Sequence, residues 1–575
     1  MSHRTIAPLA LSLLLAACAT VPPVVEAPAA APTAAAAPHT GMVSAADQRA
    51  SEAGMAMLEQ GGSATDAAIA VMLALTVVEP QSSGIGGGGF FVHGTPEGEV
   101  TTLDGREKAP GGAGPDWFLD DNGQPIPFMD AVMSGLSVGV PGNLALARKA
   151  HERYGQLEWA ALFEPAIELA RDGFVITPRL NATLARAKNR AGRVPEGQAL
   201  FYDAAGEPLP VGTLVKNPAL ADSLAQIAAE GPDWLYQGPA GAQLADYVAA
   251  DTPRDGAMVP ADLRHYEAKW RSPVCGEYRV YRICGMGPPS SGATTVFAIL
   301  KQLEQFDLAA LGPDSPTSWH LFAESQRLAY ADRGRYLGDS DFVDVPVAGL
   351  VNSAYLTARG SLISPTSTLA DPEPGVPPGA DLALAEGPEW PEHGTSHFAV
   401  VDREGDAVSW TSTVEGPFGS GLMYGGFYLN NELTDFTMVP LVDGVPVANR
   451  VEGSKRPRSS MSPTLVYGPE GNLRIAIGAA GGATIPVQTA KALIGVLDWG
   501  LTAQEAIALP GLFSPGDTIV LEPGSSLLAM KGDLEALGHK VVEHDMPFKA
   551  NAVEFVGGQW LGAADPRSEG VALGN

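Results

Sequence analysis

Cysteine, aromatic residues and positive charge are all scarce in this 575-residue chain. It contains 3 cysteines and 7 % aromatic residues, and its 36 Lys and Arg face 65 Asp and Glu, a formal net charge of −29. Such an excess of negative charge repels nucleic acids and anionic membranes, so we expect neither as a partner. No long block of like charge stands out, which is typical of a solvated acidic surface.

The hydrophobic runs are too short for a helix of about 20 residues that spans a bilayer. The run at 67–78, AAIAVMLALTVV, is apolar on all sides and predicts a buried core helix. The run from Ile6 to Ala17 follows Arg4 and ends in small residues, which is typical of a secretory signal. With 45 % hydrophobic and 18 % charged residues, the composition fits a globular protein with a sizeable core.

The N-terminal signal ends in Leu15-Ala16-Ala17-Cys18, which resembles a bacterial lipobox. Such signals are cut before the cysteine, which then carries lipid; plain secretion with cleavage nearby is the alternative. The sequence predicts a signal peptide over 1–17, lipidation of Cys18 and an Ala/Pro-rich tether over 18–40. Ala19 takes the place of the Asp that favours inner-membrane retention. We therefore expect a periplasmic protein, held by its lipid on the outer membrane of a Gram-negative bacterium.

The other two cysteines, Cys275 and Cys284, flank an alternating stretch that is typical of a β-hairpin. If the two-residue turn is Arg279-Val280, the cysteines face each other at a non-hydrogen-bonded pair. Their Cα atoms would then lie about 4.5 Å apart, near the short limit for a disulfide. An oxidising periplasm permits that bond, and two free buried thiols are the alternative.

Helical patterns dominate the first part of the chain and strand patterns the last part. The helical patterns cover 46–78, with caps in Ser44–Asp47 and at Ser63 or Thr65, then 143–172 with a break at Tyr154-Gly155, 293–309 and 316–335. Short strand patterns alternate with turns from 396 onward. The stretch between them, 361–394, is rich in Pro, Gly and Asp, which predicts an exposed connection.

Two glycine motifs lack the structural context that their usual functions need. Gly84–Gly89 has the spacing of a dinucleotide-binding loop, but a helix pattern precedes it and a strand pattern follows, the reverse of what that loop requires. Gly135-Leu-Ser137-Val-Gly139 matches the esterase elbow, but residues 138–142 delay the helix that must follow the serine. We expect close backbone packing at the first motif and no esterase nucleophile at Ser137.

The segment HGTSHFAVVD, residues 393–402, places a threonine between two histidines. His393 and His397 have the spacing of a helical metal pair, but Gly394 and the following strand pattern argue against a helix, so we expect no metal there. An internal threonine is a poor nucleophile. If the bond before Thr395 is cut, however, the new α-amino group, with a pKa of about 7.7–8.0, serves as the base for its hydroxyl.

This segment resembles the processing site of the γ-glutamyltranspeptidase family of N-terminal-nucleophile hydrolases. Further blocks of the family follow in order from about residue 41 to the C-terminus. They are GGSATDAA (61–68), EPQSSGIGGGGFF (79–91), LDGREKAP (103–110), SVGVPG (137–142), MGPPSSG (286–292), ESQRLAYADRGRYLGD (324–339), YLNNELTDF (428–436), KRPRSSMSPT (455–464) and AAGGATI (479–485). Both glycine motifs fall inside these blocks, which disposes of the dinucleotide and esterase interpretations.

The resemblance implies the machinery of acyl transfer. Thr395 matches the threonine that cuts its own chain and then becomes the N-terminal nucleophile. Thr413 matches the threonine that orients the hydroxyl of the nucleophile. Gly481 and Gly482 match the glycines whose N–H groups form the oxyanion hole, where one donor is worth roughly 3–4 kcal/mol.

The resemblance also implies a site for a free amino-acid head group. Arg106 matches the arginine that binds the substrate α-carboxylate, for which a two-pronged guanidinium is suited. Ser459 and Ser460 match serines that contact the same carboxylate, and Glu432 and Asp435 match the acidic pair that holds the α-ammonium.

Two departures from the family pattern concern the substrate site. Glu415 stands where many members have Asn, which adds a carboxylate near the ammonium position. Residues 437–454 are short and contain no aromatic residue, so we expect a reduced, open lid.

The resulting prediction is an α+β, four-layer αββα N-terminal-nucleophile sandwich, cut between Gly394 and Thr395. Its parts would be residues 41–394, the large subunit after the tether, and 395–575, the small catalytic subunit, held together as a heterodimer. The expected partners are a glutathione-like γ-glutamyl donor and water, an amino acid or a peptide as acceptor, with no cofactor or metal. A glutaryl-type acylase of the same family and a processing-dead envelope binding protein are the alternatives.

Overall fold

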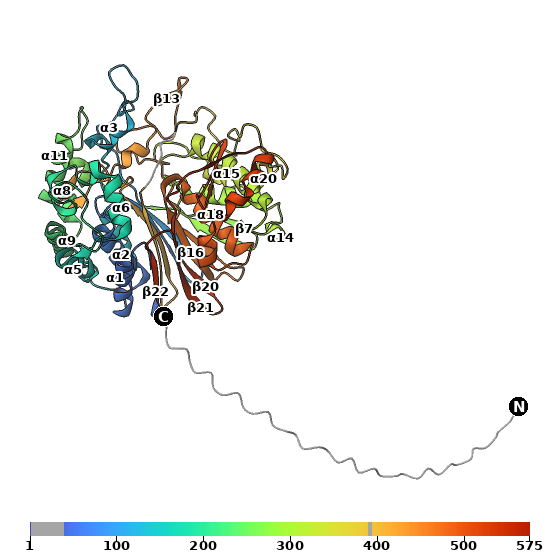
Figure 1. Ribbon diagram of the computed structural model, residues 1–575, viewed down its shortest axis with the longest axis horizontal. Coiled ribbons are helices and arrows are strands. Elements are labelled where there is room, and N and C mark those ends of the chain that lie inside the picture. Colours follow the sequence, from blue (N-terminus) through green and yellow to red (C-terminus); the bar gives the residue numbers. More distant parts are fainter. Residues whose placement is uncertain (2–39, 389–393, 575) are drawn as a thin grey trace, which may run out of the picture. The chain divides into compact units, whose positions relative to one another are not determined.

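The computed structural model describes Met1 and residues 40–388 and 394–574. The predicted signal peptide except Met1, Cys18, nearly all of the tether and His393 lie outside these residues. Two antiparallel sheets face each other, and a layer of helices covers the outer face of each (Figure 1). This arrangement confirms the predicted αββα sandwich.

The first sheet has seven strands in the order β22-β1-β9-β10-β2-β3-β6. Their bounds are β1 Gly41–Ala45, β2 Gly88–Gly94, β3 Val100–Gly105, β6 Lys269–Arg271, β9 Ser396–Asp402, β10 Ala407–Thr413 and β22 Val571–Gly574. Phe398 and Val400 of β9 pack toward the outer helices, whereas Ala399 and Val401 pack between the sheets. Both faces of β9 are therefore buried, which explains its continuous apolar run.

The second sheet has six strands in the order β21-β20-β16-β15-β8-β7. Their bounds are β7 Val274–Tyr278, β8 Tyr281–Gly285, β15 Thr464–Tyr467, β16 Leu473–Ala480, β20 Lys549–Val556 and β21 Gln559–Ala564. Smaller ladders are β4 Phe174–Val175 with β5 Leu214–Val215, β11 Met423–Tyr424 with β12 Phe427–Tyr428, β13 Leu441–Val442 with β14 Val445–Pro446, and β17 Leu512–Phe513, β18 Thr518–Leu521 and β19 Lys540–Glu543.

The helical layer on the first sheet is built around α2, Ala64–Val78, all of whose residues are buried. Ser63 caps α2 and forms a capping box with Asp66, which settles the predicted choice between Ser63 and Thr65. The other helices of this half are α1 Gln48–Glu59, α3 Phe128–Val132, α4 Asn143–Tyr154, α5 Glu164–Asp172, α6 Pro178–Arg186, α7 Lys188–Ala191, α8 Pro195–Phe201, α9 Pro218–Glu230, α10 Asp233–Tyr236, α11 Pro239–Ala250 and α12 Pro260–Arg264.

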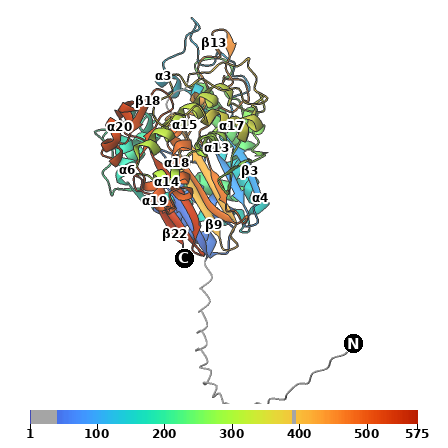
Figure 2. The same ribbon diagram turned by 90° about the vertical axis from the view of Figure 1, so that its right-hand side faces the viewer.

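The opposite helical layer contains α13, Gly292–Leu303, α15, Pro316–Tyr336, and α18, Ile485–Leu497 (Figure 2). The single helix predicted over 293–309 is wrong at its end. Asp307 caps a separate short helix, α14, so the chain turns after Leu303. The remaining helices are α14 Leu308–Leu311, α16 Val347–Leu350, α17 Ser353–Gly360, α19 Ala503–Ala508 and α20 Lys531–Ala536. No helix in the described ranges is both long and apolar enough to cross a membrane.

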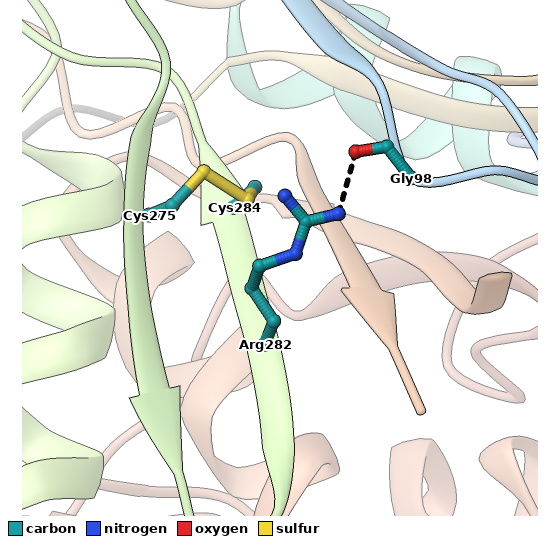
Figure 3. Close-up of a disulfide and its surroundings, with 4 residues drawn as sticks. All are labelled: Gly98, Cys275, Arg282 and Cys284. Carbon is teal, nitrogen blue, oxygen red and sulfur yellow. Dashed lines mark hydrogen bonds between the residues drawn. A yellow bond between two sulfur atoms is a disulfide. The ribbon is translucent and has the colours of Figure 1, made fainter. Parts of the chain in front are cut away.

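The predicted cysteine hairpin is confirmed in its register. Cys275 pairs with Cys284 across β7 and β8, the turn is Arg279-Val280, and the two cysteines form a disulfide (Figure 3). Next to it, Arg282 donates to the carbonyl oxygen of Gly98 at 2.5 Å, which ties the hairpin to the turn after β2.

Candidate active site

Thr395 lies immediately before β9 and is only 5 % exposed. Its φ of 139° is unusual for a β-branched residue, so the backbone is held in a strained conformation at this position. The Thr395 hydroxyl donates to Oγ1 of Thr413 at 3.3 Å. A threonine with a strained backbone and a hydrogen-bonded hydroxyl is suited to act as a nucleophile.

Thr413 ends β10, and its hydroxyl oxygen also accepts the N–H of Glu415 at 2.8 Å. The N–H bond fixes the rotamer of Thr413, and Thr413 in turn holds the Thr395 hydroxyl. The predicted orienting role of Thr413 has the contact that it requires.

Gly394, the residue before the predicted cut, has no room for a side chain. A Cβ there would lie 1.7 Å from the carbonyl oxygen of Glu415. Glu415 itself has a φ of 71°, in the left-handed region. The chain on both sides of the predicted cut is therefore tightly constrained.

Gly481 and Gly482 follow β16 with φ values of 121° and 58°, which favour glycine. Among residues 40–388 and 394–574, the N–H group of neither glycine donates a backbone hydrogen bond. The loop is held from behind, since Gln488 donates to the Ala480 carbonyl at 2.7 Å and Thr484 donates to that of Gly481 at 2.8 Å. Two N–H groups held in this way can donate hydrogen bonds to an oxyanion.

Arg106, just after β3, is 1 % exposed and forms ion pairs with Glu432 and Asp435. Its guanidinium also donates to the carbonyl oxygens of Pro457 at 3.2 Å and Arg458 at 2.9 Å. The residues predicted to bind an α-carboxylate and an α-ammonium thus lie in direct contact. A zwitterionic head group offers the same two charges and can exchange partners with them.

Glu107 is a buried acid that the sequence did not single out, although it lies in the block LDGREKAP. Burial raises its pKa to about 7, Arg106 opposes that shift, and Glu432 lies near enough for the two carboxyl groups to interact. Burial also raises the pKa of Glu432. Two neighbouring carboxyl groups in a dry site favour sharing a proton.

The two predicted serines face different partners. Ser459 lines the pocket, and its hydroxyl oxygen accepts the N–H of Met461 at 3.2 Å. The hydroxyl of Ser460 instead accepts Nη2 of Arg333 at 2.7 Å, and Ser460 is not among the residues that line the pocket. Only Ser459 is placed for direct contact with a carboxylate in this arrangement.

Glu415 lines the same pocket, and its carboxylate accepts from the amide of Asn431. Arg190 of α7 lies near enough for its charge to interact with that of Glu415, and burial lowers the pKa of this arginine. Residues 441–446 of the short lid region form the hairpin β13–β14, and Asn449 beside it donates to the carbonyl oxygen of Asp435 at 2.7 Å.

The excluded motifs have structural roles. A Cβ on Gly86 or Gly87 would lie 2.0 Å or 1.9 Å from a carbonyl oxygen, of Tyr428 or Thr413, so close backbone packing requires glycine. Ser137 donates to the carbonyls of Val132 and Ser134. His397 is buried in β9, and burial lowers its pKa to about 3. Within the described ranges no cluster of three potential metal ligands occurs.

Apart from Gly481 and Ser460, the predicted catalytic and substrate-binding residues converge on one pocket, although Arg106 and Glu432 lie 326 residues apart in the chain. It is lined by Arg106, Gly394, Thr395, Thr413, Glu415, Glu432, Asp435, Ser459, Met461, Gly482 and Ile485. The pocket joins the hydroxyl of Thr395, the backbone of Gly482 and the opposite charges of Arg106 and its two acidic partners. This set is suited to acyl transfer from a donor with a free amino-acid head group.

Comparison with known proteins gives the same picture. The family model described as "Gamma-glutamyltranspeptidase" matches residues 50–575. A "Glutathione hydrolase proenzyme" of Escherichia coli is 37 % identical over 540 residues, 92 % of this chain and 90 % of the relative. An "Acylase ACY 1 proenzyme" of a Pseudomonas species is 35 % identical over 542 residues, 93 % of each chain.

Among solved structures, a cephalosporin acylase from Bacillus halodurans superimposes with a TM-score of 0.80 at 25 % identity. The match covers 96 % of this chain and 99 % of that structure. The similarity therefore extends through both sheets and both helical layers.

Proposed function

The chain belongs to the γ-glutamyltranspeptidase family, and from this premise we propose that it is a glutathione hydrolase and γ-glutamyltransferase whose nucleophile is Thr395. The observation that carries the proposal is the single pocket in which Thr395 and Gly482 meet Arg106, Glu432 and Asp435. Family membership supports acyl transfer as the reaction class. The charged residues of the pocket support a γ-glutamyl donor with a free amino-acid head group.

Maturation begins with attack of the Thr395 hydroxyl on the carbonyl carbon of Gly394. The peptide C–N bond breaks as an ester bond forms, and the nitrogen of Thr395 gains the proton that the hydroxyl loses. Water then hydrolyses the ester, which leaves a carboxylate on Gly394 and a free α-amino group on Thr395. The unusual φ of Thr395 favours release of this peptide bond.

In turnover the free α-amino group takes the proton of the Thr395 hydroxyl, which attacks the γ-glutamyl carbonyl. The N–H groups of Gly481 and Gly482 stabilise the oxyanion. The departing amine receives the proton and leaves a glutamyl ester on Thr395. Water or the amine of an amino acid or peptide then takes the glutamyl group and restores the hydroxyl.

Recognition of the donor depends on its two α-charges. Arg106 binds the α-carboxylate with help from Ser459, and Glu432 and Asp435 bind the α-ammonium. A glutaryl donor lacks the ammonium, so its carboxylate would compete with Glu432 and Asp435 for Arg106 without bringing a cation of its own, which disfavours it. Every step uses a side chain or backbone group of the chain itself, so the proposal invokes no cofactor or metal.

The proposal extends to the N-terminal region and the cellular location. Cleavage before a lipidated Cys18 would leave residues 18–40 as a tether to the outer membrane and the enzyme in the periplasm. Its support is the lipobox-like sequence Leu15-Ala16-Ala17-Cys18. The large and small polypeptides, ending at Gly394 and starting at Thr395, would remain a heterodimer.

Intact masses of the purified wild-type and Thr395→Ala proteins test the nucleophile. By proportion of the 59.6 kDa chain, we expect wild-type polypeptides of about 39 and 19 kDa, the smaller beginning at Thr395, and an uncut variant. The mass of the larger polypeptide also reports lipid on Cys18. An uncut, inactive wild type would contradict the proposal and favour an envelope binding protein.

Anilides of γ-glutamate and of glutarate test the donor, since they differ by the α-ammonium alone. We expect the γ-glutamyl anilide to have the higher kcat/KM by at least about tenfold, the scale of one lost charged contact. Equal or faster turnover of the glutaryl anilide would make the enzyme a glutaryl acylase.

A further inference from the structure

A buried ionic cluster lies directly behind the nucleophile and outside the substrate pocket. Its members are Glu79 at the end of α2, Ser396 at the start of β9 and Lys549 at the start of β20, and each is at most 3 % exposed. Ser396 donates to Oε2 of Glu79 at 2.5 Å, and Nζ of Lys549 donates to the same oxygen at 2.8 Å. Lys549 also reaches the Ser396 hydroxyl at 3.3 Å.

Such a buried ionic cluster adds little to the net stability of the fold. Taking a carboxylate and an ammonium group out of water is unfavourable, and their mutual attraction only partly offsets that cost. Burial accordingly lowers the pKa of Lys549 to about 8, although Glu79 opposes that shift. A buried ion pair at this position fits a role in fixing geometry.

Lys549 connects the segment that carries Thr395 to the loop that carries Gly481 and Gly482. It does so through its side chain on one side and its backbone on the other. Its ammonium group contacts the neighbour of Thr395, whereas its backbone pairs with Ala480, the residue before Gly481. Gln488 strengthens the second link, because it accepts the Lys549 N–H at 3.0 Å and donates to the Ala480 carbonyl at 2.7 Å. One residue therefore spans from the nucleophile strand to the oxyanion loop.

Glu79 supplies the anchor from the other side of the predicted cut. Once the bond before Thr395 is broken, Thr395 becomes a chain end, and chain ends fray unless they are tied down. Ser396 is the first residue behind that end, and its hydroxyl is held by Glu79 of the other polypeptide.

We propose that Lys549 and Glu79 are positioning residues, which hold Ser396, and with it Thr395, at a fixed distance from the Gly481–Gly482 loop. The inference rests on the proposed roles of Thr395 and the two glycines. Neither residue lines the pocket. Misplacement of a reacting group by about 1 Å can cost as much as 100-fold in rate, so the effect falls on kcat and on the rate of self-cleavage.

Lys549→Met and Glu79→Gln test the proposal, and Lys491→Met is the matched control. Lys491 is also a buried lysine, 3 % exposed, but it donates to the carbonyls of Ile507 and Leu509, which lie outside the pocket. For the cleaved fraction of each test variant we expect kcat at least about tenfold below wild type with KM within threefold. We also expect slower self-cleavage, and for Lys491→Met a lower Tm with kcat within twofold of wild type.

Equal kcat values for Lys549→Met and Lys491→Met, or a KM that rises in step with the loss of kcat, would overturn the proposal. If Lys549→Met does not fold, Ser396→Ala replaces it, since this variant removes one hydroxyl and leaves the Lys549–Glu79 pair. We expect kcat to fall about threefold at unchanged KM, and an unchanged kcat would equally overturn the proposal. A wild type that cuts itself but ignores γ-glutamyl donors refutes the proposed function alone, because the self-cleavage rates still test the positioning.

Discussion

At the scale of single residues, Arg106 holds three adjacent features of the pocket together. Its guanidinium contacts the carboxylates of Glu432 and Asp435 and two backbone carbonyls of the 457–458 segment. A lysine keeps the charge but lacks the planar fork of five N–H donors with which the guanidinium reaches all these acceptors. The arginine is therefore the counter-charge of the acidic pair and, in the proposed mechanism, the ligand for the α-carboxylate.

Arg106→Lys should raise the KM for the γ-glutamyl anilide at least about tenfold and leave kcat within about threefold. The reason is that a hydrogen bond to a charged group is worth roughly 1.5–3 kcal/mol, whereas the guanidinium does not touch the reacting carbonyl in the proposed mechanism. Steady-state kinetics of the cleaved protein measure both constants. The control substrate is the 4-aminobutanoyl anilide, which lacks the α-carboxylate, and an equal rise of KM for both anilides would refute the assigned role.

The sequence could name most of the site but not the contacts inside it. Thr395, Thr413, Arg106 and Gly482 were identified from motifs, and all four line one pocket. The bond of Ser460 to Arg333 was not predictable, because 127 residues separate the partners along the chain. The ionic link between Glu79 and Lys549 joins residues 470 apart, and no local pattern encodes such a pairing.

At the scale of elements, local signals were the reliable ones. A capping box at Ser63 and an apolar surface on all sides fixed α2, and turn length fixed the β7–β8 register. The helix predicted over 293–309 was wrong at its end, because periodicity continued past Leu303 while Asp307 offered a new cap. Periodicity locates helices well, and competing caps decide where they end.

The β7–β8 hairpin yields a prediction about stability. β7 is the edge strand of its sheet, and the disulfide between Cys275 and Cys284 closes a loop with a sequence separation of 9. Loop-closure entropy for such a loop corresponds to about 3 kcal/mol. Replacing both cysteines by alanine should lower the free energy of unfolding by about that amount in urea, with kcat/KM unchanged, since neither cysteine lines the pocket.

The matching control for the hairpin is the wild type in a thiol reductant. Its free energy of unfolding should approach that of the double-alanine variant, while the variant itself should not respond to the reductant. A variant as stable as the oxidised wild type would show that the bond does not limit unfolding.

At the scale of the whole molecule, the predicted cut lies just before β9, and the two products would each contribute strands to the same sheet. In the order β22-β1-β9-β10-β2-β3-β6, strands β1, β2, β3 and β6 precede Thr395, and β22, β9 and β10 follow it. β1 pairs with β22 on one side and β9 on the other. The second sheet joins β15, from after the cut, to β8, from before it. Neither product can leave without breaking strand ladders and opening both cores.

The two polypeptides of the cleaved wild type should therefore remain together in about 1 M salt and part only when the fold is lost. Salt screens surface charges but leaves buried strand pairs and apolar contacts intact. Because unfolding then coincides with dissociation, each tenfold increase in protein concentration favours the folded heterodimer by about 1.4 kcal/mol, so its denaturant midpoint should rise with concentration. The uncut Thr395→Ala chain unfolds as one molecule, so its midpoint should not depend on concentration. Size-exclusion chromatography and urea titrations at two concentrations measure both effects. Separation of two folded polypeptides in salt would mean that the interleaved strands do not hold the enzyme together.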